Sequence, residues 1–136
     1  MSKKNILLGA HISIAGGFEK AISRAKDLGC TSMQIFTKNN KSWFAKEITD
    51  DEAQLFVEAL KASSLSKIMA HTSYLINIGS GRPEVEKKSV IALSKEIERC
   101  EKLKIPYLVI HPGAHIGTGE EVCIKKIALN LDKILD

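Results

Sequence analysis

Four histidines follow short apolar runs, in positions where they could bind a metal ion; they are His11, His71, His111 and His115. If the apolar runs are parallel strands, their carboxyl ends meet at one edge of a sheet, where α/β proteins build their active sites. Neutral imidazole suits zinc, and catalytic zinc sites hold three protein ligands and a water. One histidine after a strand is more often a hydrogen-bonding loop residue, but three strands that end in histidine indicate a shared site.

The spacing within the last pair favours a loop over a helical metal motif. His111 and His115 are four residues apart, but a Pro-Gly pair at positions 112–113 separates them and disfavours a helix. A carboxylate that would complete a metal site is hard to find nearby. Glu120 and Glu121 stand at the start of the last predicted helix, where acidic residues are expected simply because they complement the helix dipole.

Residues 36–43, with the sequence Phe-Thr-Lys-Asn-Asn-Lys-Ser-Trp, follow the second apolar run and could contact nucleic acid. Amides and lysines suit phosphate contacts, and an aromatic ring can stack on bases or wedge between them. We therefore interpret Lys38, Asn39, Lys41 and Trp43 as candidate DNA contacts. The alternative is a capping loop with Trp43 folded beneath it.

A second loop, residues 71–79, places Tyr74 and Leu75 directly after a predicted strand. Such apolar side chains need a partner, which could be DNA or the helix beneath the loop. The Ser-Ile-Ala-Gly-Gly segment at 13–17 precedes the first predicted helix, and its backbone N–H groups could hold a phosphate, although glycine before a helix is commonly just a turn.

Four apolar runs carry these candidate residues, at positions 6–10, 32–36, 68–70 and 107–110. Each is followed by polar or glycine-rich residues and then by a helical pattern, which gives a strand-helix unit four times over. The runs are continuous and not alternating, which favours strands covered by helices on both faces, and hence a parallel sheet.

The intervening helices are predicted from their periodicity and their end signals. The first contains Phe18 and Leu28 on its buried stripe and stops at residue 29, a glycine. The second begins with a capping box in which Thr49 pairs with the residue at position 52, a glutamate. The third begins at Pro83 and runs to residue 103, and the last begins near residue 120 with Ile124 on its buried face.

Length and composition indicate one globular domain or part of one. The chain has 136 residues, 44% of them hydrophobic, a formal charge of +4 and a pI near 9.0, so that basicity alone decides little about its partners. Cys30, Cys100 and Cys123 are odd in number and widely spaced, which predicts reduced thiols and no CxxC metal site. No signal-peptide or membrane-spanning pattern is recognised, so we expect a cytoplasmic protein without a membrane partner.

The sequence ends in the fourth helical pattern, with no following strand. Four strand-helix units leave an open parallel sheet, whereas a TIM (β/α)8 barrel takes eight units and typically about 250 residues. The sequence therefore predicts an α/β fold that is either a small open domain or half a barrel, without an internal domain boundary.

Four segments together resemble the endonuclease IV family in order and spacing. They are Gly-Ala-His-Ile-Ser at 9–13 with the glycines at 16–17, residues 36–43, residues 71–79, and His-Pro-Gly-Ala-His at 111–115. The resemblance extends from about Asn5 to Asp136 and corresponds to about the first half of the family's TIM-type barrel. It implies that residues 1–136 are the N-terminal half of an AP endonuclease family 2 barrel, comprising its first four βα units.

The resemblance implies a cytoplasmic base excision repair enzyme, a hydrolase that cleaves the phosphodiester on the 5′ side of an abasic site in double-stranded DNA. Such enzymes use three zinc ions and a metal-activated water. By motif, His71 and His111 would bind one zinc, and His11 and His115 would belong to the substrate pocket or support the ligands. Lys41, Tyr74 and Leu75 fall where the family enters the minor groove, kinks the duplex and holds the abasic nucleotide flipped out.

Two departures limit what this chain could do by itself. Position 41 is lysine where family members can carry arginine, which keeps the charge but loses a planar stacking surface. None of the family's catalytic carboxylates is present, so at most one zinc is expected here. The alternatives are a sugar isomerase or epimerase on a related divalent-metal barrel, and a non-catalytic half-barrel that binds DNA or pairs with itself. A further partner could be a second chain that completes the barrel.

Overall fold

The computed structural model describes residues 6–136, so the first five residues of the predicted 1–136 domain lie outside the described residues. Its sheet has four parallel strands in the order β1-β2-β3-β4: β1 (Gly9–His11), β2 (Ser32–Phe36), β3 (Lys67–His71) and β4 (Leu108–Val109). Sequential strand order with a helix after each strand is the pattern of a TIM-type barrel. The predicted α/β fold with four βα units is thus confirmed.

The helices begin where the end signals of the sequence predict; they are α1 (Phe18–Asp27), α2 (Asp50–Lys61), α3 (Pro83–Lys102) and α4 (Glu120–Leu135). The capping box is present, because the Glu52 amide donates to Thr49 Oγ1 at 3.2 Å and the Thr49 amide donates to Glu52 Oε2 at 2.9 Å. Each helix except the last leads back to the amino end of the next strand, so the loops after the strands gather at the opposite edge.

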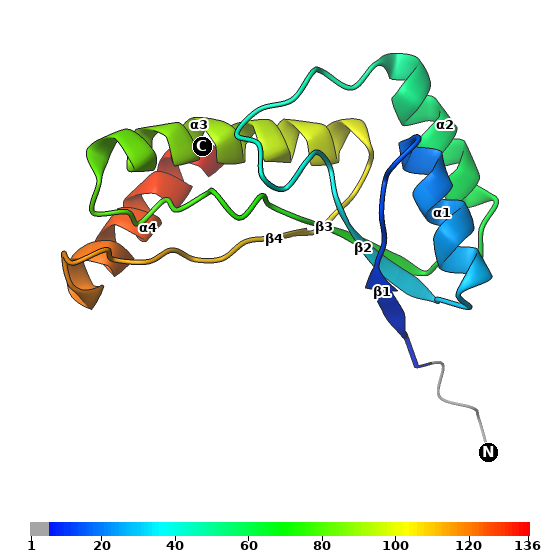
Figure 1. Cartoon of the computed structure of the whole chain (residues 1–136), viewed down its shortest axis with the longest axis horizontal. Helices are drawn as coiled ribbons and strands as arrows, with labels where there is room; N and C mark the ends of the chain where they lie inside the picture. Colours follow the sequence, from blue (N-terminus) through cyan, green and yellow to red (C-terminus); the bar gives the residue numbers. More distant parts are fainter. Residues whose placement is uncertain (1–5) are drawn as a thin grey trace.

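Helices cover one face of the sheet, and the prediction of coverage on both faces is wrong for this chain. Burial alternates along β2, where Met33 and Ile35 are 2% and 0% exposed while Gln34 between them is partly exposed. Figure 1 shows α1, α2 and α3 on one side of the strands and open space on the other. In a closed barrel that second face meets the strands across the barrel interior, and residues 6–136 supply only four strands.

Two apolar clusters hold the helices against the sheet. The larger lies between α1, α2 and the strands and includes Phe18 and Phe56, whose ring centres are 6.3 Å apart; the smaller lies beneath α3 and α4. Leu28 and Ile124, predicted on buried faces, are 68% and 65% exposed. Leu28 follows the last residue of α1 as its C-cap, and Ile124 stands beside the buried Cys123 at the margin of the apolar stripe of α4.

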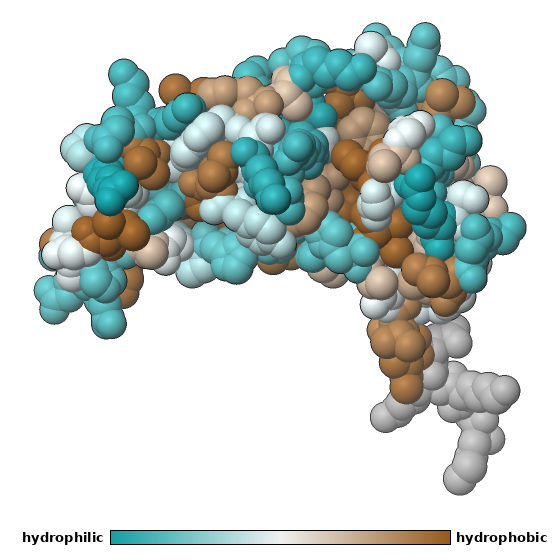
Figure 2. Space-filling view, viewed as in Figure 1, coloured by the Kyte–Doolittle hydropathy of each residue, from teal (hydrophilic) through white to brown (hydrophobic). Residues whose placement is uncertain are grey.

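Apolar side chains are exposed where the chain enters the first strand. Ile6 and Leu8 are 76% and 74% exposed, and Figure 2 shows hydrophobic surface at this end of the molecule. This surface lies at the open β1 edge, where a complete barrel would continue. Within residues 6–136, no helix has the length and apolar content to cross a membrane.

Candidate functional site

Strands β3 and β4 bring His71 and His111 together. His71 is the last residue of β3 and pairs in register with Val109 of β4, and His111 follows two residues later. The two imidazole rings are 5.1 Å apart between centres and inclined by 61°. Parallel pairing alone produces this proximity, because it sets the ends of neighbouring strands side by side.

A hydrogen bond fixes which nitrogen of His71 is free. Its Nδ1 lies 2.8 Å from the carbonyl oxygen of Thr72, which can only accept, so Nδ1 carries the proton and Nε2 of the neutral ring keeps its lone pair. Backbone carbonyls commonly orient zinc-binding histidines in this way. Two imidazoles bound to one tetrahedral zinc have ring centres roughly 5 Å apart, so the spacing of His71 and His111 fits two ligands of one zinc.

The pair is not a complete metal site. Residues 6–136 contain no cluster of three or more His, Cys, Asp or Glu side chains that could hold an ion. A catalytic zinc needs at least one more protein ligand.

Phe36 stands between His11 and the pair. Its ring centre is 4.3 Å from that of His11 and 5.6 Å from that of His71, with which it pairs in register. The side-chain Nε2 of Gln34 donates to Nδ1 of His11 at 2.9 Å. Burial and, secondarily, repulsion from His71 whenever that ring is protonated lower the pKa of His11 below 6.5, which favours a neutral ring whose Nε2–H is a donor.

His115 lies apart from this cluster. Its ring is exposed, and its Nδ1 accepts a hydrogen bond from the Gly117 amide at 3.1 Å. Asn77 fixes the preceding turn from the β3–α3 loop, because its Nδ2 donates to the Ala114 carbonyl at 2.9 Å and its Oδ1 accepts from the Ala114 amide at 3.1 Å. The loop that carries His115 is thus tied to the loop after β3.

Tyr74 forms the exposed border of the histidine cluster. Its side chain is 63% exposed, and its ring centre is 5.4 Å from that of Phe36 and 6.3 Å from that of His111. The Tyr74 amide donates to the Asn40 carbonyl at 3.2 Å, which joins this loop to the β2–α2 loop. The neighbouring Leu75 is only partly exposed.

The β2–α2 loop, residues 37–49, presents Asn39 and Lys41 to solvent next to Tyr74. Its tip is a turn in which the Lys41 amide donates to Asn39 Oδ1 at 2.8 Å. Lys38 has a different environment from the one expected of a phosphate contact. Its ammonium is buried, 3.0 Å from a carboxylate oxygen of Glu96, and donates to the Ser42 carbonyl at 2.6 Å.

Trp43 packs onto the outside of α3. It is partly buried against the α3–α4 cluster, and the Lys88 ammonium lies 4.8 Å from its ring centre. This arrangement corresponds to the alternative of a capping loop with the indole folded beneath it. A cation above the ring stabilises that position.

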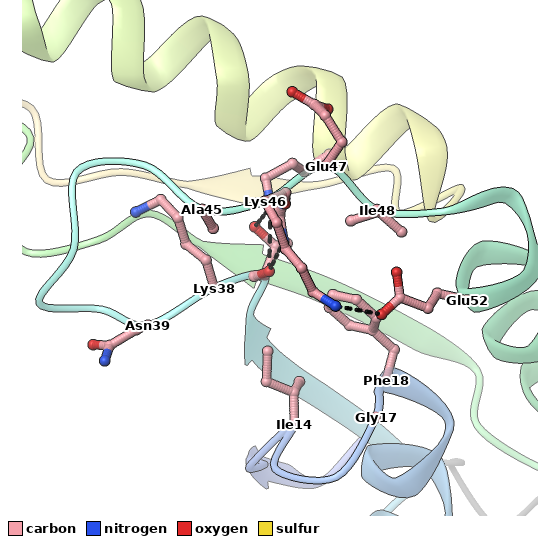
Figure 3. Close-up of a pocket in the computed structure, with 12 residues that line it drawn as sticks. Ile14, Gly17, Phe18, Lys38, Asn39, Ala45, Lys46, Glu47, Ile48 and Glu52 are labelled. Carbon is pink, nitrogen blue, oxygen red and sulfur yellow. Dashed lines mark hydrogen bonds and ion pairs between the residues drawn. The ribbon is translucent and has the colours of Figure 1, made fainter.

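Three hollows border the β2–α2 loop, and two of them also touch the segment between β1 and α1. One, of about 630 Å³, opens at the carboxyl edge beside His11 and Phe36 and is also lined by Asn39 and Asn40. The other, of about 250 Å³, lies between this loop and the start of α1, and Figure 3 shows Lys46 reaching Glu52 across it. The second hollow has no histidine in its wall, so the first is the one that belongs with the candidate site.

Sequence reasoning missed the side chains that hold the site together, above all Glu96 and Arg99 of α3. Glu96 is 1% exposed and bonded to both loops, and Arg99 donates to the carbonyls of Thr37 and Lys46. A signal was available, because position 96 falls at helical spacing on the stripe of Leu93 and Cys100. An acid on an apolar stripe indicates a buried, paired carboxylate.

Comparisons with known proteins agree with this geometry. The family model described as xylose isomerase-like TIM barrel matches residues 22–136. A protein of Geobacter sp. strain M21 named probable endonuclease 4 is 45% identical over 128 residues, which cover 94% of this chain and 45% of the relative. The chain spans about half the length of the curated relatives it matches.

Solved structures show the same likeness. The crystal structure of endonuclease IV from Thermus thermophilus superposes with a TM-score of 0.79 at 32% identity, over 93% of this chain and 47% of that one. A 3-keto-D-glucoside 4-epimerase from E. coli gives a TM-score of 0.67 at 13% identity over 96% of this chain and 51% of that one, which shows a shared fold alone. The resemblance to endonuclease IV is confirmed.

Proposed function

The chain belongs to the xylose isomerase-like TIM barrel family, and on that premise we propose that it is the N-terminal half of a zinc-dependent DNA repair endonuclease. The proposed reaction is hydrolysis of the phosphodiester 5′ to an abasic site in duplex DNA. The juxtaposition of His71 and His111, with Nε2 of His71 free, is the observation that supports this proposal most directly. The 45% identity to a probable endonuclease 4 supports it independently.

In the proposed reaction, a water oxygen bonds to phosphorus and the bond from phosphorus to the 3′ oxygen breaks. That oxygen takes a proton and leaves as a 3′-hydroxyl, and the phosphate stays on the abasic deoxyribose. Zinc, when bound, would supply the Lewis acidity that makes the water a nucleophile and neutralises the phosphate. His71 and His111 would hold one such ion, while the Nε2–H of His11 would donate to a phosphate or sugar oxygen in the adjoining hollow.

The proposed DNA contacts come from the two loops beside the histidines. Lys41 and Asn39 would contact phosphates, and the exposed Tyr74 ring, with Leu75 behind it, would stack in the gap left by the flipped-out nucleotide. Lys38 would act indirectly, because its ammonium is already paired inside the loop. Trp43 would likewise support the loop from its contact with α3.

The remaining zinc ligands and strands would come from polypeptide equivalent to the other half of the relatives, within a longer protein or in a second chain. The open β1 edge with its exposed Ile6 and Leu8 supports such a completion. We expect chain 1–136 alone to self-associate in sedimentation velocity. A monodisperse monomer with cooperative unfolding would contradict this part of the proposal.

Zinc and DNA binding test the proposal on this chain. We expect weak binding of at most one zinc per chain by calorimetry, strongly reduced in His71→Ala and His111→Ala and retained in the matched control His115→Ala. We also expect tighter binding of a duplex with one abasic analogue than of the intact duplex. Equal affinity for the two duplexes, or zinc binding that survives both ligand substitutions, would contradict the proposal.

Incision completes the test. Chain 1–136 with added zinc is incubated with a duplex that carries one abasic site, beside a chelator-treated sample. Chelator-sensitive cleavage 5′ to the lesion would mean that self-association supplies the missing ligands. If chain 1–136 alone does not cleave the duplex, we expect incision when it is joined to, or mixed with, the other half of a relative.

A further inference from the structure

We propose that Glu96 is a positioning residue that sets the β2–α2 loop and the β3–α3 loop in one fixed relation, and thereby places Lys41 beside Tyr74 for DNA binding. This inference rests on the proposed function for its consequence, but the loop geometry it describes can be measured without DNA. Glu96 lies on α3, and it is distant in sequence from the proposed zinc ligands and from the proposed DNA contacts. It would act entirely through other residues.

The Glu96 carboxylate accepts hydrogen bonds from both loops. From the β2–α2 loop, the Thr37 hydroxyl donates to Oε2 at 2.8 Å, and the Lys38 ammonium lies 3.0 Å from Oε1. From the β3–α3 loop, the Ser73 amide donates to Oε1 at 3.2 Å. One buried carboxylate thus joins the residue that follows β2 to the residue that precedes Tyr74.

The Lys38 side chain connects Glu96 to the tip of the β2–α2 loop. Its ammonium sits between Glu96 and the carbonyl of Ser42, to which it donates at 2.6 Å. Ser42 closes the tip, because its amide donates to the Asn39 carbonyl at 3.1 Å. Lys41 is the residue inside this turn. Its exposed ammonium is therefore carried by a turn whose base is fixed to Glu96.

The two loops also touch each other directly at one point. The Tyr74 amide donates to the Asn40 carbonyl at 3.2 Å, next to Lys41. This contact joins the exposed Tyr74 to the partly exposed Asn40, and so links the two loops at the surface. The buried Glu96 carboxylate bonds to both of these loops. We therefore expect the hydrogen bond between Tyr74 and Asn40 to depend on Glu96.

Stability alone does not account for a charged pair at this place. The Lys38 and Glu96 side chains are 3% and 1% exposed, and burial of both charges costs free energy that their attraction has to offset. An apolar pair of similar volume is often equally stable or more so. An apolar pair, however, makes no directional bonds. The Glu96 carboxylate makes such bonds to three residues in two loops: Thr37, Lys38 and Ser73.

Arg99, one turn along α3, provides a second anchor for the same loop. Its guanidinium donates to the Thr37 carbonyl at 2.5 Å and to the Lys46 carbonyl at 2.7 Å, at the two ends of residues 37–46. It makes no such bond to the β3–α3 loop among the described residues. Loss of Glu96 should therefore leave the β2–α2 loop attached to α3 but uncouple it from Tyr74.

The experiment compares Glu96→Gln, the apolar double variant Glu96→Leu with Lys38→Met, and the control Glu98→Gln, an exposed acid on the same helix. Amide hydrogen exchange is followed at Lys41 and Tyr74, whose amides do not bond to Glu96, and at the interior of α3. We expect exchange at least tenfold faster at Lys41 and Tyr74 in both Glu96 variants, with α3 unchanged. Acrylamide quenching of Trp43, the single tryptophan, should rise in parallel.

Binding of an abasic duplex provides the functional readout, and we expect it to weaken at least tenfold in both Glu96 variants and to stay unchanged in the control. If Glu96→Gln does not fold, the double variant, which leaves no unpaired buried charge, decides. Wild-type exchange at Lys41 and Tyr74 in a folded variant would overturn the positioning role. Faster exchange in a chain whose wild type does not prefer abasic DNA would instead refute the proposed function and leave the positioning role standing.

Discussion

Separate substitutions of Lys41 and Tyr74 should weaken DNA binding in two distinguishable ways. Lys41 is exposed at the tip of its loop, and a lysine that contacts a phosphate releases counterions when DNA binds. The slope of log affinity against log salt concentration is negative, and Lys41→Ala should therefore make it less steep by about 0.9. Between 50 and 200 mM salt this difference corresponds to about a 3.5-fold change in relative affinity.

Tyr74→Ala should weaken binding while leaving the salt slope unchanged. Stacking of an aromatic ring on a base contributes roughly 1–3 kcal/mol. The Tyr74 side chain is 63% exposed, and its covered part already contacts Phe36 and His111. One free face places the loss in the lower part of that range, about 1–2 kcal/mol, or roughly fivefold to thirtyfold in affinity.

Fluorescence anisotropy with a labelled abasic duplex at four salt concentrations measures both effects. Lys61→Ala is the matched control, since Lys61 is exposed at the end of α2 that leads to the amino end of β3, away from the histidine edge. The reasoning is refuted if Lys61→Ala makes the slope less steep by as much as Lys41→Ala does. It is refuted equally if Tyr74→Ala binds within twofold of the wild type.

Three further outcomes are expected. Phe56→Ala should lower the free energy of unfolding by about 3–5 kcal/mol, because Phe56 is 0% exposed and its removal leaves a cavity. Urea denaturation measures this loss with wild type and variant at the same chain concentration, because self-association adds to stability; a loss below about 1 kcal/mol would contradict the assigned core. NMR titration should give His11 a pKa below 6.5, and His71→Gln should raise that pKa toward 6.5. The pKa of His11 is lower in the folded than in the unfolded chain, so protonation of His11 favours unfolding. The contribution of His11 to the free energy of unfolding is therefore present above pH 6.5 and is lost as the pH falls through the pKa of the folded state. Burial raises the pKa of the Cys100 thiol to about 12, so iodoacetamide at pH 8 should modify the partly exposed Cys30 first, and equal rates would contradict the burial.

Local signals in the sequence determined most of the fold. The capping box at Thr49 and the proline at position 83 fix where α2 and α3 begin, because these residues satisfy or dispense with backbone donors that a helix start leaves free. The apolar run at 32–36 is a strand with the predicted bounds. Such signals depend on near neighbours in the chain, so they can be recognised without the tertiary structure.

The proximity of His71 and His111 was also predictable, because it follows from the strand ends that carry them and from parallel pairing. The one-sided coverage of the sheet was not. A continuous apolar run is the same whether its second face meets helices or the interior of a barrel, and the difference depends on strands beyond those described.

Tertiary structure alone decided the roles of Lys38 and Glu96. In the sequence, Lys38 is one of two lysines in the polar segment 36–43 and looks as available to DNA as Lys41. The choice between them depends on a carboxylate 58 positions along the chain that α3 places beneath the loop, 3.0 Å from the Lys38 ammonium. A buried ion pair forms only where packing removes water from both partners, and no local pattern in the sequence encodes that.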